Sequence, residues 1–188
     1  MPLTRRTFLA TAAAVPLSFG ALLALRRAPA DAAPMSGAVE EIRTTWRTLV
    51  PKGAAVATTT EPLARSDDEW KRLLDPKQYD VLRREGTEYA GTSPLNNEKR
   101  AGVYVCAGCA LPLFTSRMKF DSGTGWPSFF TSIPDHLAMK KDFKMIVERD
   151  EYHCVRCGGH QGHVFDDGPP PTRQRWCNNG VALRFLPA

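Results

Sequence analysis

The pattern of apolar and polar residues divides the chain into a helical first part and a strand-rich second part. Ser66 and Glu69 form a capping-box pattern that predicts the start of a helix. Asp75-Pro76 suits the start of a second helix, because proline fits the first helical turn, and Gly86 marks its end. The apolar positions that follow these starts at helical spacing are Trp70, Leu73, Leu74, Tyr79 and Leu82. Two consecutive helices are therefore expected before the strand-rich part.

After Gly86, short runs of strand-like residues alternate with glycine, proline and aspartate. The strand candidates are residues 102–105, 143–149 and 181–186. We therefore expect a mainly β (α+β) fold, with an antiparallel β body behind a helical prefix. Residues 31–64 show only weak periodicity and are expected to form a linker, with a short helix over residues 39–49.

The first 30 residues have the layout of an export signal. Arg5 and Arg6 precede a mostly apolar run over residues 8–25, and small residues with the spacing of a cleavage site follow. The sequence around the two arginines is similar to a twin-arginine motif, which directs the export of folded proteins. We expect a periplasmic or otherwise extracytoplasmic protein. A leader that stays attached as a membrane tether is the alternative, because the run is only marginally long enough to span a bilayer.

The charge balance changes once the leader is set aside. The 188-residue chain has a formal net charge of +5, but cleavage after Ala30 would remove four arginines and no acids, leaving 21 basic residues against 20 acidic ones. A nucleic-acid-binding surface needs a clustered basic excess, so we expect no nucleic-acid partner. With 43% hydrophobic and 24% charged residues, the composition is that of a globular protein, and residues 65–188 are expected to form its domain.

Four of the five cysteines occur in two identical Cys-x-x-Cys pairs, Cys106 with Cys109 and Cys154 with Cys157. Two such turns can supply four thiolates to one zinc ion, and a site with four protein ligands is structural. Disulfides are the alternative in an oxidising compartment, but a protein that folds before export can load zinc in the cytosol. A thioredoxin-like redox pair is less consistent, because neither pair lies in an evident βαβ unit.

Cys177 is the unpaired cysteine. An isolated free cysteine is more often a small buried apolar residue than a nucleophile. Here Arg175 lies two residues away and would favour the thiolate. His160, His163 and Asp167 lie just upstream and could transfer protons near neutral pH. As metal ligands the histidines are less convincing, because four cysteines already complete a zinc site.

The stretch "FDSGTGWPSFF" contains Trp126 in a loop bounded by glycine and proline. A tryptophan in such a position commonly fills a core. It could also form one wall of an apolar pocket, because the indole presents a rigid face to a methyl group or a thioether.

Together, "DSGTGWPSF", "CGGHQGHVFDDGP", "RWCNNGVALRF" and the two cysteine pairs resemble the B-type methionine sulfoxide reductases. The resemblance covers roughly residues 66–187. It implies a small barrel-like β fold of two antiparallel sheets, with structural zinc set away from the active site. It also implies reduction of the R epimer of methionine sulfoxide in oxidised proteins or peptides, since each epimer has its own reductase.

The resemblance also implies roles for individual residues. Cys177 would be the nucleophile, and Trp126 would line the pocket for the substrate methyl group. The residues around the sulfoxide oxygen and the nucleophile would be His160, His163, Asp167, Arg175 and Asn179. The zinc ligands would be Cys106, Cys109, Cys154 and Cys157. A sulfoxide oxygen leaves poorly unless it is protonated, so we expect His163, and after it His160, to act as the acid.

The chain departs from the family pattern at one informative position. Many members carry a recycling cysteine where this chain has Thr124. We therefore expect the sulfenic acid of Cys177 to be reduced by an external thioredoxin-like or small thiol, and we expect a monomer. The alternative is a zinc-ribbon binding module without catalysis, which would explain the paired cysteines but neither Cys177 nor the histidines.

Overall fold

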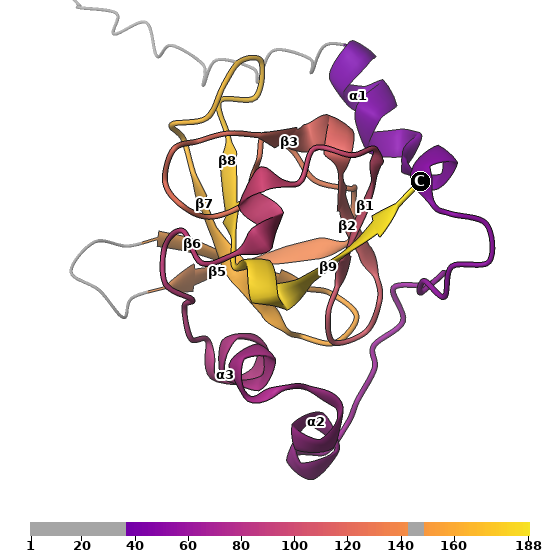
Figure 1. Cartoon of the computed structure of the whole chain (residues 1–188), viewed down its shortest axis with the longest axis vertical. Coiled ribbons are helices and arrows are strands. Elements are labelled where there is room, and N and C mark those ends of the chain that lie inside the picture. The colour runs from indigo at the N-terminus through magenta and orange to yellow at the C-terminus, as the bar shows by residue number, and fades with distance from the viewer. Residues whose placement is uncertain (1–36, 143–148) are drawn as a thin grey trace, which may run out of the picture. The chain divides into compact units, whose positions relative to one another are not determined.

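The computed structural model describes residues 37–142 and 149–188, and in this part of the chain nine strands form two antiparallel sheets (Figure 1). The smaller sheet has the order β2-β1-β9. Its strands are β1 Gly102–Cys106, β2 Pro112–Thr115 and β9 Leu183–Pro187. The larger sheet has the order β3-β4-β8-β7-β6-β5. Its strands are β3 Lys119–Phe120, β4 Ser128–Phe129, β5 Leu137–Asp142, β6 Arg149–Cys154, β7 His160–Phe165 and β8 Arg175–Asn178. The expected mainly β fold class is confirmed.

Aromatic side chains hold the two sheets together in one core. Phe114 of β2 stacks on Phe129 of β4 with ring centroids 4.1 Å apart. Tyr104 meets the same Phe129 ring edge-on at 5.0 Å, and Phe114 also meets Trp176 of β8 edge-on at 6.4 Å. Such pairs contribute about 0.5–1.5 kcal/mol each beyond the burial of their area. The core therefore fixes β8, which carries Trp176, against the smaller sheet.

The two helices expected before the strands are α2 Asp67–Leu73 and α3 Pro76–Arg84. Ser66 and Glu69 form the capping box, as expected. Trp70 and Leu74 are buried, but Leu73 points outward and is 56% exposed, which corrects its assignment to the apolar face. The helix α3 contacts β7 and the short 3-10 helix η4 Gly180–Ala182. This contact brings the helical prefix next to the strands that carry the sequence motifs.

A short helix was expected over residues 39–49, and the structure has α1 Gly37–Thr44 followed by the 3-10 helix η1 Trp46–Leu49. Trp46 is buried in the core. Beyond it, the Ala57 N–H donates to the Ala110 carbonyl at 2.9 Å, and the Leu63 N–H donates to the Arg156 carbonyl at 2.6 Å. The stretch expected as a linker therefore packs on the β body and is bonded to both Cys-x-x-Cys regions.

The three strand predictions had different outcomes. Residues 102–105 form most of β1, as expected. Residues 143–148 lie outside the described part, and Arg149 begins β6. The last prediction placed the strand start too early, because residues 180–182 form η4 and the strand begins at Leu183. The remaining 3-10 helices are η2 Pro94–Asn97 and η3 Ser116–Met118.

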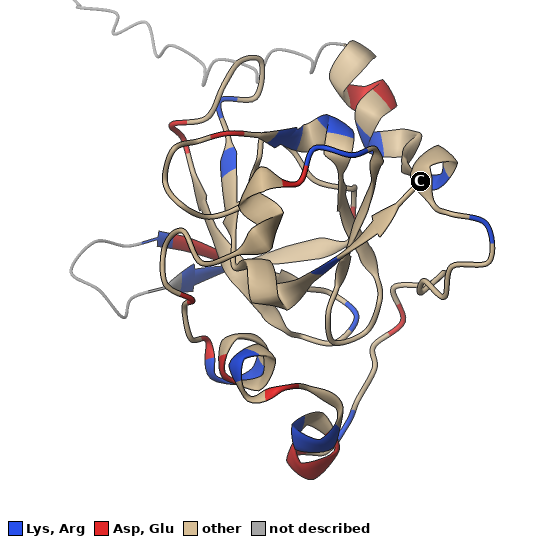
Figure 2. Cartoon of the chain, viewed as in Figure 1, with Lys and Arg blue, Asp and Glu red and all other residues tan. Residues whose placement is uncertain are grey.

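Acidic and basic residues share the same elements on the surface (Figure 2). On α2, Lys71 pairs with Asp67 at 2.6 Å, and Lys141 of β5 pairs with Asp150 of β6 at 2.8 Å. None of the helices described between residues 37 and 188 has the length and apolar character needed to cross a membrane. The expected export signal lies outside the described residues.

Candidate active site and metal centre

The ladder between β7 and β8 brings the lone cysteine beside a histidine. Cys177 lies opposite His163, and Arg175 lies opposite Phe165. Because successive side chains of a strand point to opposite faces, these four side chains share one face of the sheet. His160 and His163 both lie on β7, which begins at His160.

The other face of the same two strands belongs to the core. Val164 lies opposite Trp176 there, and Trp176 is in the buried aromatic cluster. Gly162 permits the close approach of β7 to β8, because a Cβ at this position would lie 1.9 Å from the carbonyl oxygen of Cys177. Cys177 therefore lies on a strand that pairs with β4 on one side and β7 on the other, and whose opposite face packs on the core.

A cavity of about 260 Å³ opens over Cys177. Its lining residues are Thr87, Thr124, Trp126, Arg149, Gly162, His163, Phe165, Arg175, Cys177, Asn178 and Asn179. Trp126 and Phe165 give it aromatic surface, while His163 and Arg175 give it hydrogen-bond donors. A cavity with both characters suits a small group that has an apolar and a polar end.

Burial raises the pKa of the Cys177 thiol above its usual value. The Arg175 guanidinium and a hydrogen bond from the Thr124 hydroxyl act in the opposite direction and lower it. The sequence led us to expect a thiolate favoured by Arg175. Arg175 acts in the expected direction, but burial has the larger effect and the pKa of Cys177 is raised overall.

Asp167 holds Arg175 from outside the cavity. Its carboxylate accepts two hydrogen bonds from the guanidinium, at 2.7 Å from Nε and 2.9 Å from Nη2. The Asp167 side chain is 63% exposed, whereas that of Arg175 is only 10% exposed. The guanidinium also lies 4.2 Å from the centre of the Phe165 ring. Asp167 was expected near the sulfoxide oxygen, but it is not among the cavity-lining residues and instead orients the arginine.

The two histidines have different environments. His160 is 2% exposed, and its Nδ1 lies 2.9 Å from a carboxylate oxygen of the buried Glu151. Burial lowers the pKa of His160, with Glu151 acting in the opposite direction. The two imidazole rings are 5.5 Å apart, yet only His163 lines the cavity. Of the two expected acids, His163 therefore lines the cavity over Cys177, whereas His160 is buried and does not reach it.

Glu88 connects the tryptophan loop to the segment that follows Cys177. Its carbonyl oxygen accepts a hydrogen bond from Trp126 Nε1 at 3.0 Å, and its N–H donates to Asn179 Oδ1 at 3.0 Å. Its carboxylate accepts the backbone N–H groups of Gly180 and Val181. Asn179 Nδ2 also donates to a backbone carbonyl of β7, at 3.0 Å. The Asn179 amide is therefore committed to holding the backbone, which limits its direct role in the cavity.

Three hydroxyl groups line up beside the nucleophile. Ser128 lies opposite Cys177 on β4, and its Oγ lies 2.7 Å from Ser122 Oγ. Ser122 Oγ is in turn 2.9 Å from Thr124 Oγ1. Thr124 therefore belongs to a hydroxyl network that ends at the Cys177 thiol.

Several residues at this site were not predicted from the sequence, Phe165 and Glu88 among them. Phe165 follows His163 by two positions on a strand, so strand periodicity would have placed it on the same face. Glu88 carries no local signal, because its partners are distant in the sequence. Of the expected residues, those that line the cavity are Cys177, His163, Arg175, Asn179 and Trp126.

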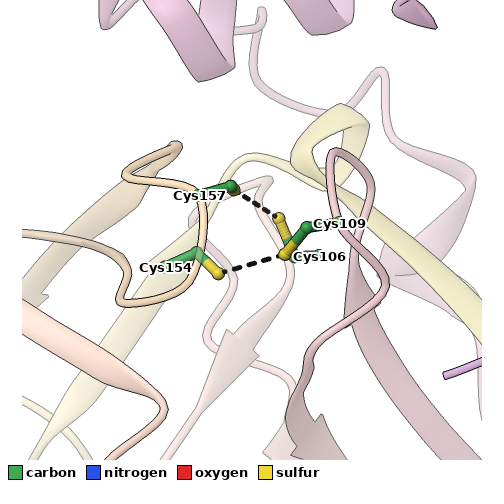
Figure 3. Close-up of side chains that lie close together, drawn as sticks. All are labelled: Cys106, Cys109, Cys154 and Cys157. Carbon is green, nitrogen blue, oxygen red and sulfur yellow. Dashed lines mark hydrogen bonds between the residues drawn. The ribbon is translucent and has the colours of Figure 1, made fainter. Parts of the chain in front are cut away.

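The four remaining cysteines form a separate cluster (Figure 3). Their sulfur atoms all lie within 4.8 Å of one another, with Cys106 to Cys157 at 3.6 Å and Cys109 to Cys154 at 3.5 Å. Four sulfurs at ~2.3 Å from a tetrahedral zinc ion would be separated by about 3.8 Å. The cluster therefore fits zinc, and since no ligand position is left open, the site is structural.

The two Cys-x-x-Cys turns have the same local conformation. In each turn the carbonyl of the first cysteine accepts an N–H four residues on, from Ala110 in one turn and from Gly158 in the other. Both of these residues have positive φ, 60° and 67°. The buried Gln161 amide donates to Cys106 Sγ at 3.5 Å. Because Gln161 lies between the two histidines on β7, the metal centre supports the strand that carries His163.

A metal-braced β domain with a solitary thiol in an aromatic-walled cavity defines a thiol-dependent enzyme. Residues 74–187 match the SelR domain, and the chain belongs to this family, the B-type methionine sulfoxide reductases. A Leifsonia xyli relative named "Peptide methionine sulfoxide reductase MsrB" is 50% identical over 127 residues, which cover 66% of this chain and 91% of the relative. A Methanosarcina barkeri protein of the same name is 50% identical over 122 residues, covering 64% of this chain and 86% of the relative. The Arabidopsis thaliana "Peptide methionine sulfoxide reductase B1, chloroplastic" is 46% identical over 136 residues, covering 72% of this chain and 67% of that protein.

Proposed function

We propose that the chain reduces the R epimer of methionine sulfoxide in oxidised proteins and peptides, with Cys177 as the nucleophile. The observation that carries the proposal is the register of Cys177 with His163 in a cavity walled by Trp126 and Phe165. A methyl sulfoxide has an apolar methyl group and a polar oxygen, and this cavity offers a surface for each. The non-catalytic zinc-ribbon alternative is not favoured, because it explains neither this cavity nor the family membership.

The first half-reaction moves one oxygen atom. The Cys177 sulfur attacks the electrophilic sulfur of the sulfoxide while His163 donates a proton to the sulfoxide oxygen. The sulfur–sulfur bond then breaks as the oxygen passes to Cys177, which leaves methionine and a Cys177 sulfenic acid. The substrate sulfur gains two electrons, and the cysteine sulfur loses two.

Arg175 has two tasks in this scheme. It stabilises the thiolate that must form from a buried thiol, and it supports negative charge on the oxygen during transfer. Asp167 holds the guanidinium at the angle these tasks need. The zinc ion that Cys106, Cys109, Cys154 and Cys157 would hold supplies folding energy and takes no part in the oxygen transfer.

The second half-reaction requires an external thiol. The chain has five cysteines, and the four besides Cys177 form the metal cluster. A first thiol condenses with the sulfenic acid to give a mixed disulfide and water, and a second thiol releases Cys177. Because Thr124 lines the cavity without offering a second thiol, the reductant is a thioredoxin-like protein or a small thiol.

The activity test uses the two separated epimers of N-acetyl methionine sulfoxide with dithiothreitol as the reductant. We expect turnover of the R epimer alone, abolished in Cys177→Ser. Zinc content measured on the same samples controls for folding, because the substitution lies outside the cysteine cluster. Turnover of the S epimer, or retained turnover in Cys177→Ser, would contradict the proposal.

The recycling step is tested by quenching turnover with a thiol-blocking reagent and analysing the protein by mass spectrometry. We expect Cys177 as sulfenic acid or as a mixed disulfide with the added thiol. A disulfide between Cys177 and one of the cluster cysteines as the main species would refute recycling by an external thiol.

We also propose that residues 1–30 export the folded chain and that the mature domain acts as a monomer. The twin-arginine pattern at Arg5 and Arg6 supports the first point. Changing both arginines to lysine should retain the protein in the cytoplasm, and N-terminal sequencing of exported protein would identify a cleavage site or a retained tether. Light scattering of the purified mature domain tests the monomer.

A further inference from the structure

A second cavity, of about 380 Å³, lies next to the one over Cys177. It is formed by α3, by the loop over residues 87–94 and by η4. Thr87 lines both cavities, so they adjoin across a single loop residue. The volume of the second cavity falls near the lower end of the ~300–1,000 Å³ range of small-ligand pockets, and the cavity over Cys177 is smaller.

The second cavity is a groove with mainly apolar walls. The apolar residues that line it are Pro76, Val81, Tyr89, Pro94 and Val181. Tyr89 is 87% exposed, far more than the other tyrosines of the described chain, which are buried or half-buried. Exposed aromatic side chains beside a pocket are typical of surfaces that bind polypeptides. The charged residues of the lining are Lys77, Asp80 and Glu88, and the Glu88 carboxylate is engaged by the backbone N–H groups of Gly180 and Val181.

The loop that borders both cavities, residues 87–91, is fixed by hydrogen bonds to two other segments. The Glu88 carboxylate accepts the backbone N–H groups of Gly180 and Val181. On the other side, the Gly91 N–H donates to the Gly125 carbonyl at 2.8 Å, in the loop that carries Trp126. The groove therefore keeps a fixed position relative to the cavity over Cys177.

We propose that this groove binds the polypeptide segment next to the methionine sulfoxide, an inference that rests on the proposed function. A methionine in a protein continues into chain on both sides, and an extended chain advances about 3.3–3.6 Å per residue. When the sulfoxide side chain enters the cavity over Cys177, residues one to three positions away are within reach of a groove that shares Thr87 with it. An apolar side chain there would pack on Tyr89 and Val181.

The kinetic test compares kcat/KM for two R-epimer substrates, N-acetyl methionine sulfoxide and a peptide with leucine two residues from the sulfoxide. In Tyr89→Ala we expect the ratio of peptide to amino-acid kcat/KM to fall about five- to tenfold, the usual size of the loss of one buried aromatic contact. Leu73→Ala is the matched control, because Leu73 is also an exposed apolar residue but lines neither cavity. An unchanged ratio in Tyr89→Ala, or equal losses for both substrates, would overturn the inference while leaving the proposed function intact.

A direct test uses the same peptide with a benzophenone side chain in place of the leucine. The Cys177→Ser chain binds this peptide without consuming it, and irradiation followed by mass spectrometry maps the adducts. We expect adducts within residues 76–94 or at Val181. Adducts mainly on residues that do not line the groove would overturn the inference. A wild-type enzyme that fails to reduce the peptide sulfoxide would instead refute the proposed function.

Discussion

Trp126 Nε1 donates a hydrogen bond to the carbonyl oxygen of Glu88 at 3.0 Å, which fixes the wall of the substrate cavity to the loop that follows α3. The same Glu88 bonds to the segment immediately after Cys177, through Asn179, Gly180 and Val181. One residue therefore sets the distance between the aromatic wall and the strand that bears the nucleophile. Its neighbour Thr87 joins the two cavities, so the same loop also determines where a peptide substrate can lie.

Replacing Glu88 is expected to change substrate binding more than the chemical step. Glu88→Ala leaves two backbone N–H groups without their acceptor, which costs about 1–3 kcal/mol of stability and loosens η4. We expect KM to rise about five- to tenfold with little change in kcat, because the lost contacts position the cavity wall and do not touch the reacting atoms. Glu88→Gln retains one acceptor oxygen and should be intermediate. Glu61→Ala, which removes an exposed carboxylate, is the control, and a loss confined to kcat would contradict this role.

Replacing each histidine in turn should show that His163 is the general acid and that His160 stabilises the fold. His163→Gln is expected to lower kcat about 100- to 10,000-fold, the range usual for a lost general acid. His160→Gln should instead lower the melting temperature, because it breaks the buried contact with Glu151, and should retain more activity. The pH dependence of kcat and thermal denaturation of both variants give the comparison. A larger kcat loss in His160→Gln at equal folded content would assign the acid to His160.

The Cys177 thiol is expected to ionise above the usual pH for cysteine, because burial raises its pKa. The rate of alkylation by iodoacetamide, measured against pH, reports the thiolate fraction directly. Arg175→Met removes a charge that lowers this pKa, so the midpoint should move to still higher pH, while Arg175→Lys should restore part of the shift. Thr124→Val removes a hydrogen bond to the thiol and should shift the midpoint in the same direction. A midpoint that moves to lower pH in Arg175→Met would contradict this electrostatic account.

Zinc removal is expected to unfold the domain, although none of the zinc ligands belongs to the cavity over Cys177. Structural zinc contributes ~10–16 kcal/mol of apparent binding energy, as much as the total stability of a typical domain, ~5–15 kcal/mol. Cys154→Ser should therefore lose zinc and melt well below the wild type, measured by metal analysis and circular dichroism. Cys177→Ser is the matched control and should keep both its zinc and its melting temperature. A stable, zinc-free Cys154→Ser protein would show that the cluster is dispensable.

Much of the local structure could be predicted from the sequence because it depends on neighbouring residues. The capping box at Ser66 and the metal-binding turns follow from contacts between residues a few positions apart. The start of the last strand was misplaced for the opposite reason. Val181 continues the alternating pattern, but its N–H bonds to the distant Glu88 and the local chain forms η4 instead.

The relative importance of the two histidines also depended on long-range packing. His160 and His163 lie three positions apart in the sequence with similar neighbours. A β-bulge in the pairing of β6 with β7 sets His163 opposite Glu151 and His160 opposite His153, two positions apart on β6, so both histidines face the same side and their rings lie 5.5 Å apart. Burial then removes His160 from the cavity, which no local pattern indicated.

The sequence by itself determined the chemistry available to this protein: one unpaired thiol, two imidazoles nearby, four further thiols spaced for a metal, and a tryptophan in a turn. These follow from residue type and short spacing, which folding does not alter. Only the tertiary structure decided which groups meet, including the bond between Glu88 and Asn179, 91 positions apart. It also decided the ionisation of Cys177, because a pKa depends on burial, and burial is a property of the whole packed domain.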